Sequence, residues 1–317
     1  MISLKLWRAL SKPPRRHPLF QYVLLDAKRE QPRITSGFVI WAMMFATIIF
    51  TFSIILRPVA WVILGLFMAL NSIYAARWVL RIARTLTHEK ETHRYDLFAA
   101  LPVGLLGTSW ALSTGALHRR SSFRWIPYLV LVIAIVTFIA LCGLSTVTLT
   151  LIDTLSDSDK AFVENLAFAR GGIAALPFII LFYIDHVYSI LTAIVFGQLA
   201  TVDIKNTADG QIRALFGFLT IQILTYVATA GLVIVIIPNV FTVLDVNSVQ
   251  PLIVLSVIGI IIFIALREAI VFTLWQMLTR LLDADNKEIA LVLKPFYEAE
   301  LILRESEKAR ARHIDTP

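Results

Sequence analysis

Long apolar runs limit what this chain can fold into more than any other feature of its sequence. A helix needs about 20 apolar residues to cross the roughly 30 Å hydrocarbon core of a bilayer. Six segments of the 317-residue chain reach that length, at 37–56, 59–78, 126–151, 172–201, 214–238 and 252–278. Hydrophobic residues make up 58% of the chain and charged residues 16%, which is too apolar for an ordinary soluble domain. The sequence predicts an all-α polytopic membrane protein with six transmembrane helices and argues against a soluble enzyme.

The positions of the basic residues predict the orientation of these spans. Nearly all of the 29 Lys and Arg residues flank the spans on one side: before the first span, after the second, between the fourth and fifth, and after the sixth. Cytoplasmic loops of membrane proteins carry such an excess. We therefore expect a multi-pass protein of the bacterial inner (cytoplasmic) membrane, without a cleaved signal peptide and with both termini cytoplasmic. The net charge of +7 then points to membrane lipid as a partner and not to nucleic acid.

Three regions follow from this topology. They are a cytoplasmic N-terminus at 1–36, a transmembrane domain at 37–278 with a cytoplasmic loop at 79–125, and a cytoplasmic helical tail at 279–317. In the N-terminus, apolar residues recur at helical spacing from Pro18 and stop before Pro32, which predicts an amphipathic helix on the membrane surface. In the tail, an apolar stripe runs among alternating acids and bases to a break near Pro295. We expect that stripe to dock onto the protein itself.

The loop after the second span contains a further apolar segment at 103–117. It is too short to cross the bilayer, and a crossing there would carry the basic residues that follow it to the outer face. We expect instead a helix in the inner membrane interface, with Trp110 at the headgroup level that indole rings favour.

Several catalytic and metal-binding motifs are absent from the sequence. There is no G-x-x-x-x-G-K-[ST] segment, so ATP hydrolysis would require another chain. His88 and His93 flank a glutamate as in zinc proteases, but a spacing of five places them about 140° apart around a helix and not on one face. The single cysteine, Cys142, cannot form a disulfide within the chain. We expect no catalytic residue, metal site or bound cofactor in this chain.

The most informative segment of the loop begins at Glu89 and reads EKETHRYDLFAALP. A short helix with a charged rim, an apolar side (Tyr95, Leu97, Phe98 and Leu101) and a proline stop suits a contact with another protein. The segment resembles the first cytoplasmic loop of the permease subunits of ABC exporters of the type-2 membrane family, which commonly reads Glu-Arg-Glu-x-Gly-Thr-x-Glu-Leu-Leu-x-x-x-Pro. The matching residues are Glu89, Glu91, Leu97, Phe98 and Pro102, with Lys90 and Asp96 as conservative replacements.

This resemblance implies a function and a set of partners. In that family the loop forms a coupling helix that rests on an ATPase subunit and carries its motion to the spans. The chain would then be a transport subunit without an ATPase site of its own. Its partners would be a separate cytoplasmic ATPase subunit, which holds ATP and Mg²⁺, and a second permease copy or a sister permease.

Two departures from the family pattern leave an alternative open. His93 and Arg94 stand where the family has Gly-Thr, and only the 13 residues at 239–251 separate the fifth and sixth spans, where the family usually has re-entrant helical structure. The alternative is a permease-like subunit that does not transport and serves as a structural or assembly partner in a membrane complex. The segment from Glu89 would in that case be a solvated loop helix.

Two pairs of ionisable residues lie within the predicted spans, Asp185 with His186 and Arg267 with Glu268. A charge at such depth is costly unless it is paired or hydrated. Both pairs lie at similar depth in the inner half of the membrane when helical residues are counted at about 1.5 Å each. We expect Asp185 to pair with Arg267, and His186 and Glu268 to line a polar seam or a subunit contact. A pair that only fixes helix packing fits this pattern as well as one with a role in transport.

Overall fold

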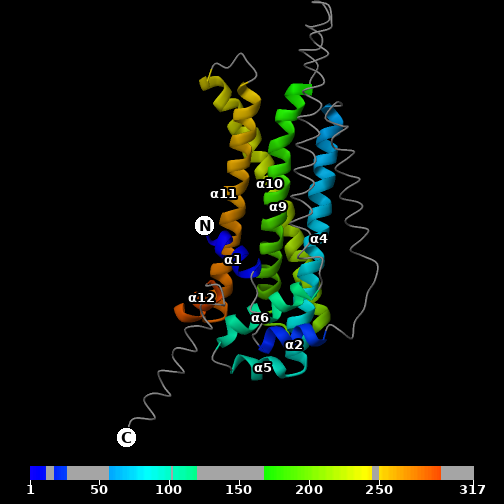
Figure 1. The fold of residues 1–317 in the computed structure, drawn as a ribbon, viewed down its shortest axis with the longest axis vertical. Helices are drawn as coiled ribbons and strands as arrows, with labels where there is room; N and C mark the ends of the chain where they lie inside the picture. Colours follow the sequence, from blue (N-terminus) through cyan, green and yellow to red (C-terminus); the bar gives the residue numbers. More distant parts are fainter. Residues whose placement is uncertain (12–17, 27–56, 101–102, 120–167, 245–249, 294–317) are drawn as a thin grey trace, which may run out of the picture.

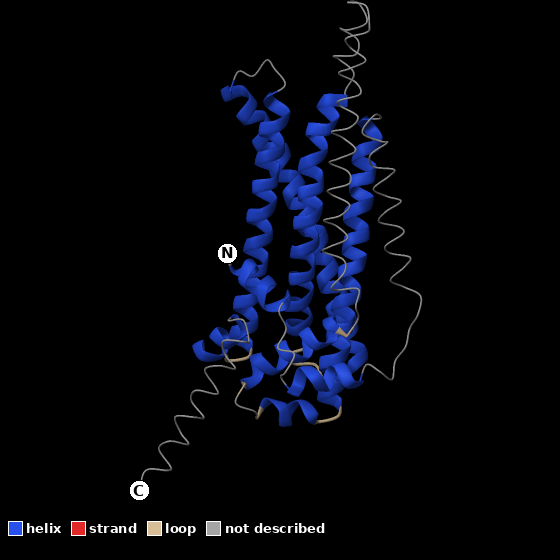
Figure 2. Cartoon of the chain, viewed as in Figure 1, coloured by secondary structure: helices blue, strands red, loops and turns tan. Residues whose placement is uncertain are grey.

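The computed structural model describes residues 1–11, 18–26, 57–100, 103–119, 168–244 and 250–293. This part of the chain is helical and contains no strand (Figure 2), which confirms the all-α prediction for these residues. The predicted first and third spans, 37–56 and 126–151, lie outside the described residues. The count of six spans therefore stays a prediction.

Four long helices run side by side through the molecule (Figure 1). They are α4 (Arg57–Glu91), α9 (Phe168–Ala200), α10 (Thr207–Leu244) and α11 (Gln250–Leu281). Segments of α9, α10 and α11 are long and apolar enough to cross a membrane, namely Ile180–Ala200, Thr207–Ile236 and Val257–Leu281. These three segments indicate a membrane protein. The predicted second span lies within α4, which continues to Glu91 and so takes up the beginning of the predicted loop.

Shorter helices gather around one end of this bundle (Figure 1). They are α2 (Pro18–Asp26), α5 (Arg94–Ala99), α6 (Gly104–His118) and α12 (Asn286–Leu293). We call this end of the bundle the α5 end. There, α6 contacts α2, α4, α5, α9 and α12. A further short helix, α1 (Ile2–Ser11), begins higher along the bundle, beside Glu268 of α11, and lies against α9, α11 and α12.

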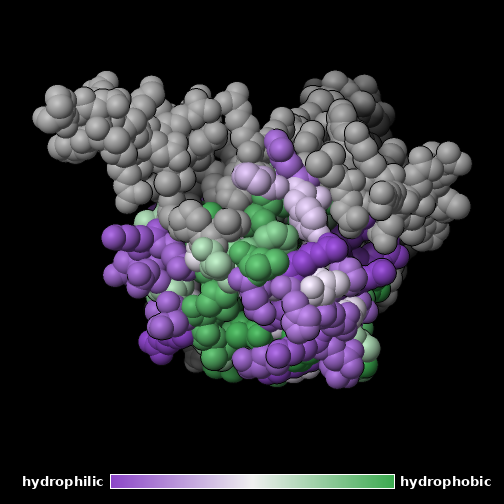
Figure 3. Space-filling view, turned by 90° about the horizontal axis from the view of Figure 1, so that it is seen from below, coloured by the Kyte–Doolittle hydropathy of each residue, from purple (hydrophilic) through white to green (hydrophobic). Residues whose placement is uncertain are grey.

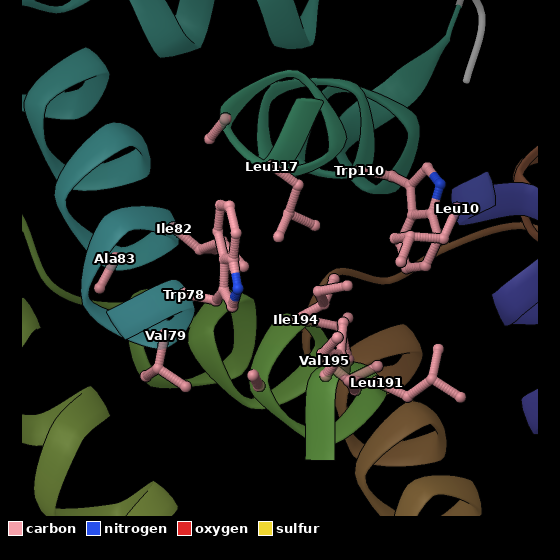
Figure 4. Packing of buried hydrophobic residues seen from close by; sticks show 14 of the residues in the cluster. Leu10, Trp78, Val79, Ile82, Ala83, Trp110, Leu117, Leu191, Ile194 and Val195 are labelled. Carbon is pink, nitrogen blue, oxygen red and sulfur yellow. The ribbon is translucent and has the colours of Figure 1, made fainter. Parts of the chain in front are cut away.

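Buried apolar side chains are concentrated where α6 meets the long helices (Figure 4). The helix is buried continuously from Leu106 to His118. Trp110 has no exposed surface, and its ring meets that of Trp275 in α11 edge-on at 5.8 Å between centroids. The protein's own helices therefore cover the indole, so Trp110 does not face lipid headgroups, and the membrane depth at which it lies stays a prediction.

The helices α2 and α12 both pack on α6. Helix α2 begins at Pro18 as predicted, but Phe20 and Val23 are buried, so its apolar face lies against the protein and not on a membrane surface. A side chain on Gly115 of α6 would come within 2.9 Å of Val23, which shows how closely the two helices approach. Val292 of α12 is also fully buried, which confirms that the first part of the apolar stripe of the tail, before Pro295, docks onto the protein. Residues 294–317 lie outside the described part.

Candidate functional site

The ionisable residues of the predicted fourth and sixth spans meet inside the bundle. Arg267 of α11 donates from Nη2 to Oδ1 of Asp185 in α9, and both side chains are fully buried. This salt bridge confirms the predicted pairing. Because taking two charges out of water is costly, such a pair is stable only when further hydrogen bonds satisfy its remaining polar atoms.

Neighbouring helices supply those hydrogen bonds to Asp185. Asn71 of α4 donates from Nδ2 to Oδ2 of the carboxylate. The hydroxyl of Tyr226 in α10 lies 3.0 Å from Oδ2 and 3.2 Å from Oδ1, and Ser189 Oγ lies 3.5 Å from Oδ1. The carboxylate of Asp185 thus joins all four long helices. We call Asn71, Asp185, His186, Tyr226 and Arg267 the polar cluster.

His186 belongs to this cluster through the same asparagine. Its Nδ1 lies 2.8 Å from Asn71 Oδ1. Since the amide nitrogen of Asn71 donates to Asp185, its oxygen is the acceptor, and we assign the proton to Nδ1 of His186. The imidazole stacks on the ring of Tyr74 with centroids 5.7 Å apart, and its Nε2 is buried without a hydrogen-bond partner. His186 therefore lines a polar seam, as predicted.

The guanidinium of Arg267 lies between two aromatic rings. Its central carbon is 5.1 Å from the ring centroid of Tyr226 and 5.2 Å from that of Phe263, so both rings offer cation–π contacts. Nε and Nη1 of Arg267 have no hydrogen-bond acceptor among the residues that the structure describes. The ion pair and the two rings together compensate the buried positive charge, and they place α9, α10 and α11 in a defined arrangement.

Glu268 takes part in a different contact. Its Oε1 accepts hydrogen bonds from the backbone amides of Ile2 at 2.7 Å and Ser3 at 3.3 Å, and its Oε2 accepts from Ser3 Oγ and from Tyr188 OH. A carboxylate at the start of a helix satisfies amides that have no partner within the helix and opposes the positive end of the helix dipole. Glu268 therefore fixes α1, a helix the sequence did not predict, and it does not contact His186.

The segment that begins at Glu89 lies at the α5 end, and its acidic residues are not all available to a partner. Glu89 completes the last turns of α4 and is only 7% exposed. The hydroxyl of Tyr22 lies 3.4 Å from Oε1 of Glu89, and Arg94 donates to the same hydroxyl at 2.8 Å. Glu89 is therefore not part of a charged rim, which corrects the prediction.

Lys90 and Glu91 bind the two helix ends that meet in the loop between α9 and α10. Lys90 Nζ donates to the carbonyl oxygens of Thr201 and, at 2.6 Å, of Val202. Glu91 Oε1 accepts from the amide of Thr207 at 2.6 Å, and this bond lowers the pKa of Glu91. Burial lowers the pKa of Lys90. A cation at the carboxyl end of α9 and an anion at the amino end of α10 oppose the partial charges of those ends.

The short helix α5 presents a small surface to the outside. Asp96 is exposed, and Leu97 is 71% exposed. Phe98 packs edge-on against Tyr22 at 5.5 Å between centroids, while burial of Tyr95 raises its pKa to about 12. The predicted apolar side is thus divided, because Tyr95 and Phe98 face the protein and Leu97 faces away. Figure 3 looks onto this end and shows hydrophilic residues over much of it, with apolar ones between them. Pro102 lies outside the described residues.

Sequence reasoning missed the uncharged partners in both regions. Tyr226, Ser189 and Tyr22 each bind a predicted site residue. Single Tyr and Ser residues occur in many membrane helices, so no signal in the sequence marked these three.

Comparison with known proteins adds no further assignment. No protein-family model, no curated protein and no solved structure matches this chain. Within the described residues, no group of three or more His, Cys, Asp or Glu side chains is placed to hold a metal ion. Any function must therefore be argued from the residues of this chain.

Proposed function

We propose that this chain is the permease subunit of an ATP-binding cassette exporter, which couples ATP hydrolysis by a separate ATPase subunit to movement of a substrate across the membrane. The observation that carries the proposal is the corner between α4 and α5. There, a long helix leaves the bundle, turns at His93, and continues as a short helix with an exposed tip.

The backbone at His93 supports the resemblance in the segment from Glu89. His93 has φ 56° and ψ 15°, in the left-handed region that glycine adopts at least cost at the end of a helix. His93 stands where the family pattern has glycine. The turn thus gives a physical reason for glycine in the pattern, and this chain makes the same turn with histidine.

The contacts of Lys90 and Glu91 support a coupling role. They connect the end of α4, directly before α5, to the end of α9 and the beginning of α10. Helix α5 itself packs against α4 and α6. A displacement of α5 by a partner would therefore be transmitted to α4, α9 and α10 through short polar contacts and not through a flexible loop.

The proposed contact with the ATPase centres on Asp96 and Leu97. Glu89 is buried, and Glu91, although exposed, already accepts from the amide of Thr207, so we place the contact on neither carboxylate. A large apolar side chain that is 71% exposed beside an exposed acid has the composition of a small protein contact with an apolar centre and a polar rim.

One observation favours the second candidate, a permease-like subunit that does not transport. Helix α10 ends at Leu244 and α11 begins at Gln250, so only residues 245–249 separate them. That leaves no room between these helices for the re-entrant structure usual in the family. The membrane fold and the α4–α5 corner fit both candidates, and the presence of an ATPase distinguishes them.

Purification of the tagged full-length protein from its own host in mild detergent, followed by mass spectrometry, tests the proposal. We expect a stoichiometric ATPase with Walker motifs to copurify. The variant Asp96→Lys with Leu97→Asp should reduce its recovery at least tenfold. Leu105→Asp is the matched control, because Leu105 of α6 is 39% exposed outside α5, and this variant should retain the ATPase.

Substitutions of Glu89 or Glu91 are poor probes of the contact, because they would break contacts that hold α4, α10 and α2 together. Recovery of integral membrane proteins alone with the wild-type chain would contradict the exporter and support the structural subunit. Equal loss of the ATPase in the α5 variant and in the Leu105→Asp control would contradict the proposed contact.

A further inference from the structure

Three arginines lie along one face of α4. Arg77, Arg81 and Arg84 follow one another at spacings of four and three residues, which places them on the same side of the helix. Arg77 and Arg84 are exposed, and neither guanidinium has an ion pair or hydrogen bond within the part of the chain that the structure describes. One turn before Arg77 the same face presents Ile73, which is 54% exposed. The face therefore changes from apolar to basic at Arg77.

The height of this stripe in the bundle follows from contacts with α10, which runs antiparallel to α4. Glu91 of α4 binds the amide of Thr207 of α10. Arg84 lies seven residues before Glu91 and the exposed Arg213 lies six residues after Thr207, so the two arginines are within about one residue of the same height. A second hydrogen bond joins the hydroxyls of Ser72 in α4 and Tyr226 in α10, farther from the α5 end. It gives the same alignment of the two helices.

Contacts with α11, which runs parallel to α4, give the same height. Asn71 and Arg267 both bind Asp185, so they lie at similar heights. Arg84 lies thirteen residues after Asn71 in α4, and the exposed Arg280 lies thirteen residues after Arg267 in α11. Three helices thus expose one arginine each at a common height. Basic residues flank the hydrocarbon layer in membrane proteins, so this height marks the headgroup layer at the α5 end.

Arg77 lies above that layer, toward the middle of the bundle. It is seven residues before Arg84, about 10 Å at about 1.5 Å per residue. At this height the neighbouring helices expose large apolar side chains: Ile223 and Leu224 of α10 at 61% each and Phe272 of α11 at 44%. An exposed arginine among lipid-facing apolar groups is costly without a negative partner.

We propose that Arg77 and Arg84 bind the phosphate of an anionic phospholipid at the α5 end of the bundle. Guanidinium groups match phosphate oxygens with paired, charge-assisted hydrogen bonds. Arg77 extends its charged end toward the headgroup layer as long basic side chains do, and Arg84 is already at that level. The central carbon of Arg81 lies 5.3 Å from the ring centroid of Trp78, which restricts where its guanidinium can point.

The exposed apolar part of the same face completes the site. Ile73 continues the line of the stripe toward the middle of the bundle, where an acyl chain attached to the bound phosphate would run. A soluble phosphate would gain nothing from this part of the helix, so the observations favour a phospholipid. The site does not depend on the proposed transport function.

Native mass spectrometry of the full-length protein in detergent, with equal amounts of phosphatidylglycerol and phosphatidylcholine added, tests this site. We expect the wild-type protein to retain phosphatidylglycerol in preference. Arg77→Gln with Arg84→Gln should reduce that preference about twenty-fivefold, at about fivefold for each guanidinium contact that the bound phosphate loses. The variant Arg77→Lys with Arg84→Lys should keep part of the preference, because it keeps the charge and loses the paired geometry.

The matched control is Arg213→Gln with Arg280→Gln. These arginines are exposed at the headgroup height but stand singly on separate helices, so we expect less than a twofold change. Unchanged lipid preference in the Arg77 and Arg84 variant would overturn the proposal. An equal loss in the control would also overturn it, in favour of general attraction by positive charge. A change of oligomeric state with unchanged lipid retention would overturn it in favour of an acidic protein partner.

Discussion

Helices α9 and α10 are consecutive and antiparallel, and both are apolar enough to cross a membrane, yet they occupy very different environments. In an apolar 18-residue window of the α9 segment 61% of the residues are buried inside the protein, against 11% in the corresponding window of the α10 segment. The more buried segment is also the less apolar, with a mean hydropathy of 1.7 against 2.1. This order is the reverse of what a soluble protein shows, where the most apolar elements are inside.

The difference follows from the solvent. A helix that faces lipid must be apolar on its exposed side, whereas a helix surrounded by other helices can bury polar groups provided that they find partners. Asp185 and Ser189 of α9 are buried in this way, while α10 exposes residues such as Val227 at 64%. Polar residues, and not the most apolar runs, therefore mark the centre of this protein.

Breaking the buried ion pair should have the largest effect on this arrangement. Arg267→Leu leaves the Asp185 carboxylate buried without its cation, and we expect a loss of roughly 3–5 kcal/mol in the free energy of unfolding. Thermal unfolding of the purified protein in detergent measures the change. The double variant Asp185→Leu with Arg267→Leu should recover much of the loss, because it leaves no charge unpaired. Arg213→Leu on the exposed side of α10 is the control, and a loss as large there would refute the role of the ion pair.

Truncating one leucine on each helix compares their environments directly. Leu191 of α9 is fully buried and Leu224 of α10 is 61% exposed. Leu191→Ala should lower the free energy of unfolding by about 2–5 kcal/mol through lost contacts and a cavity. Leu224→Ala should lower it by less than about 1 kcal/mol, because the smaller side chain leaves no cavity. Equal losses in the same detergent would mean that a protein surface, and not lipid, covers this face of α10.

The smallest expected effect concerns the junction between the two helices. The Thr207 amide lowers the pKa of Glu91 from its ordinary value of 4.5, so the ionised carboxylate is favoured in the folded state. Its contribution to stability is then fully present above about pH 4.5 and is lost as the pH falls through the lower folded-state pKa. Amide exchange at Thr207, compared between the wild type and Glu91→Gln at each pH, reports the bond. At neutral pH the Thr207 amide should exchange more slowly in the wild type than in Glu91→Gln. This difference in exchange rate should disappear in acid, and a difference that stays constant with pH would refute the assignment.

Much of the fold could be predicted because it depends on local properties of the chain. Apolar length located the helices α9, α10 and α11, and Pro18 located the start of α2. Two isolated charges of opposite sign at similar depth were sufficient to pair Asp185 with Arg267, because a membrane interior offers few other partners. The burial of Trp110 could not be predicted, because a 15-residue apolar helix can face either lipid or protein and its own composition does not distinguish them.

The candidate sites required knowledge of neighbours that are distant in sequence. The sequence shows Glu91, Glu268 and Glu288 only as charged residues. In the structure each carboxylate accepts a hydrogen bond from a backbone amide at the start of another helix, namely α10, α1 and α6 respectively. Glu288 approaches so closely that a side chain on Gly104 would overlap it. These three carboxylates thus bind helix starts within the chain, and Asp96 and Leu97 are exposed members of the predicted coupling segment.

The sequence by itself determined that this chain needs a membrane, which stretches are helical, and which few charges must find partners within it. These properties depend on hydrophobicity and on the cost of an unpaired charge, both of which are readable from residue type and spacing. Only the tertiary structure decided which helix is central, which acids hold other helices, and that Arg77 stands among apolar neighbours. Those properties depend on the heights and faces of separate helices, which packing sets and no single stretch of sequence contains.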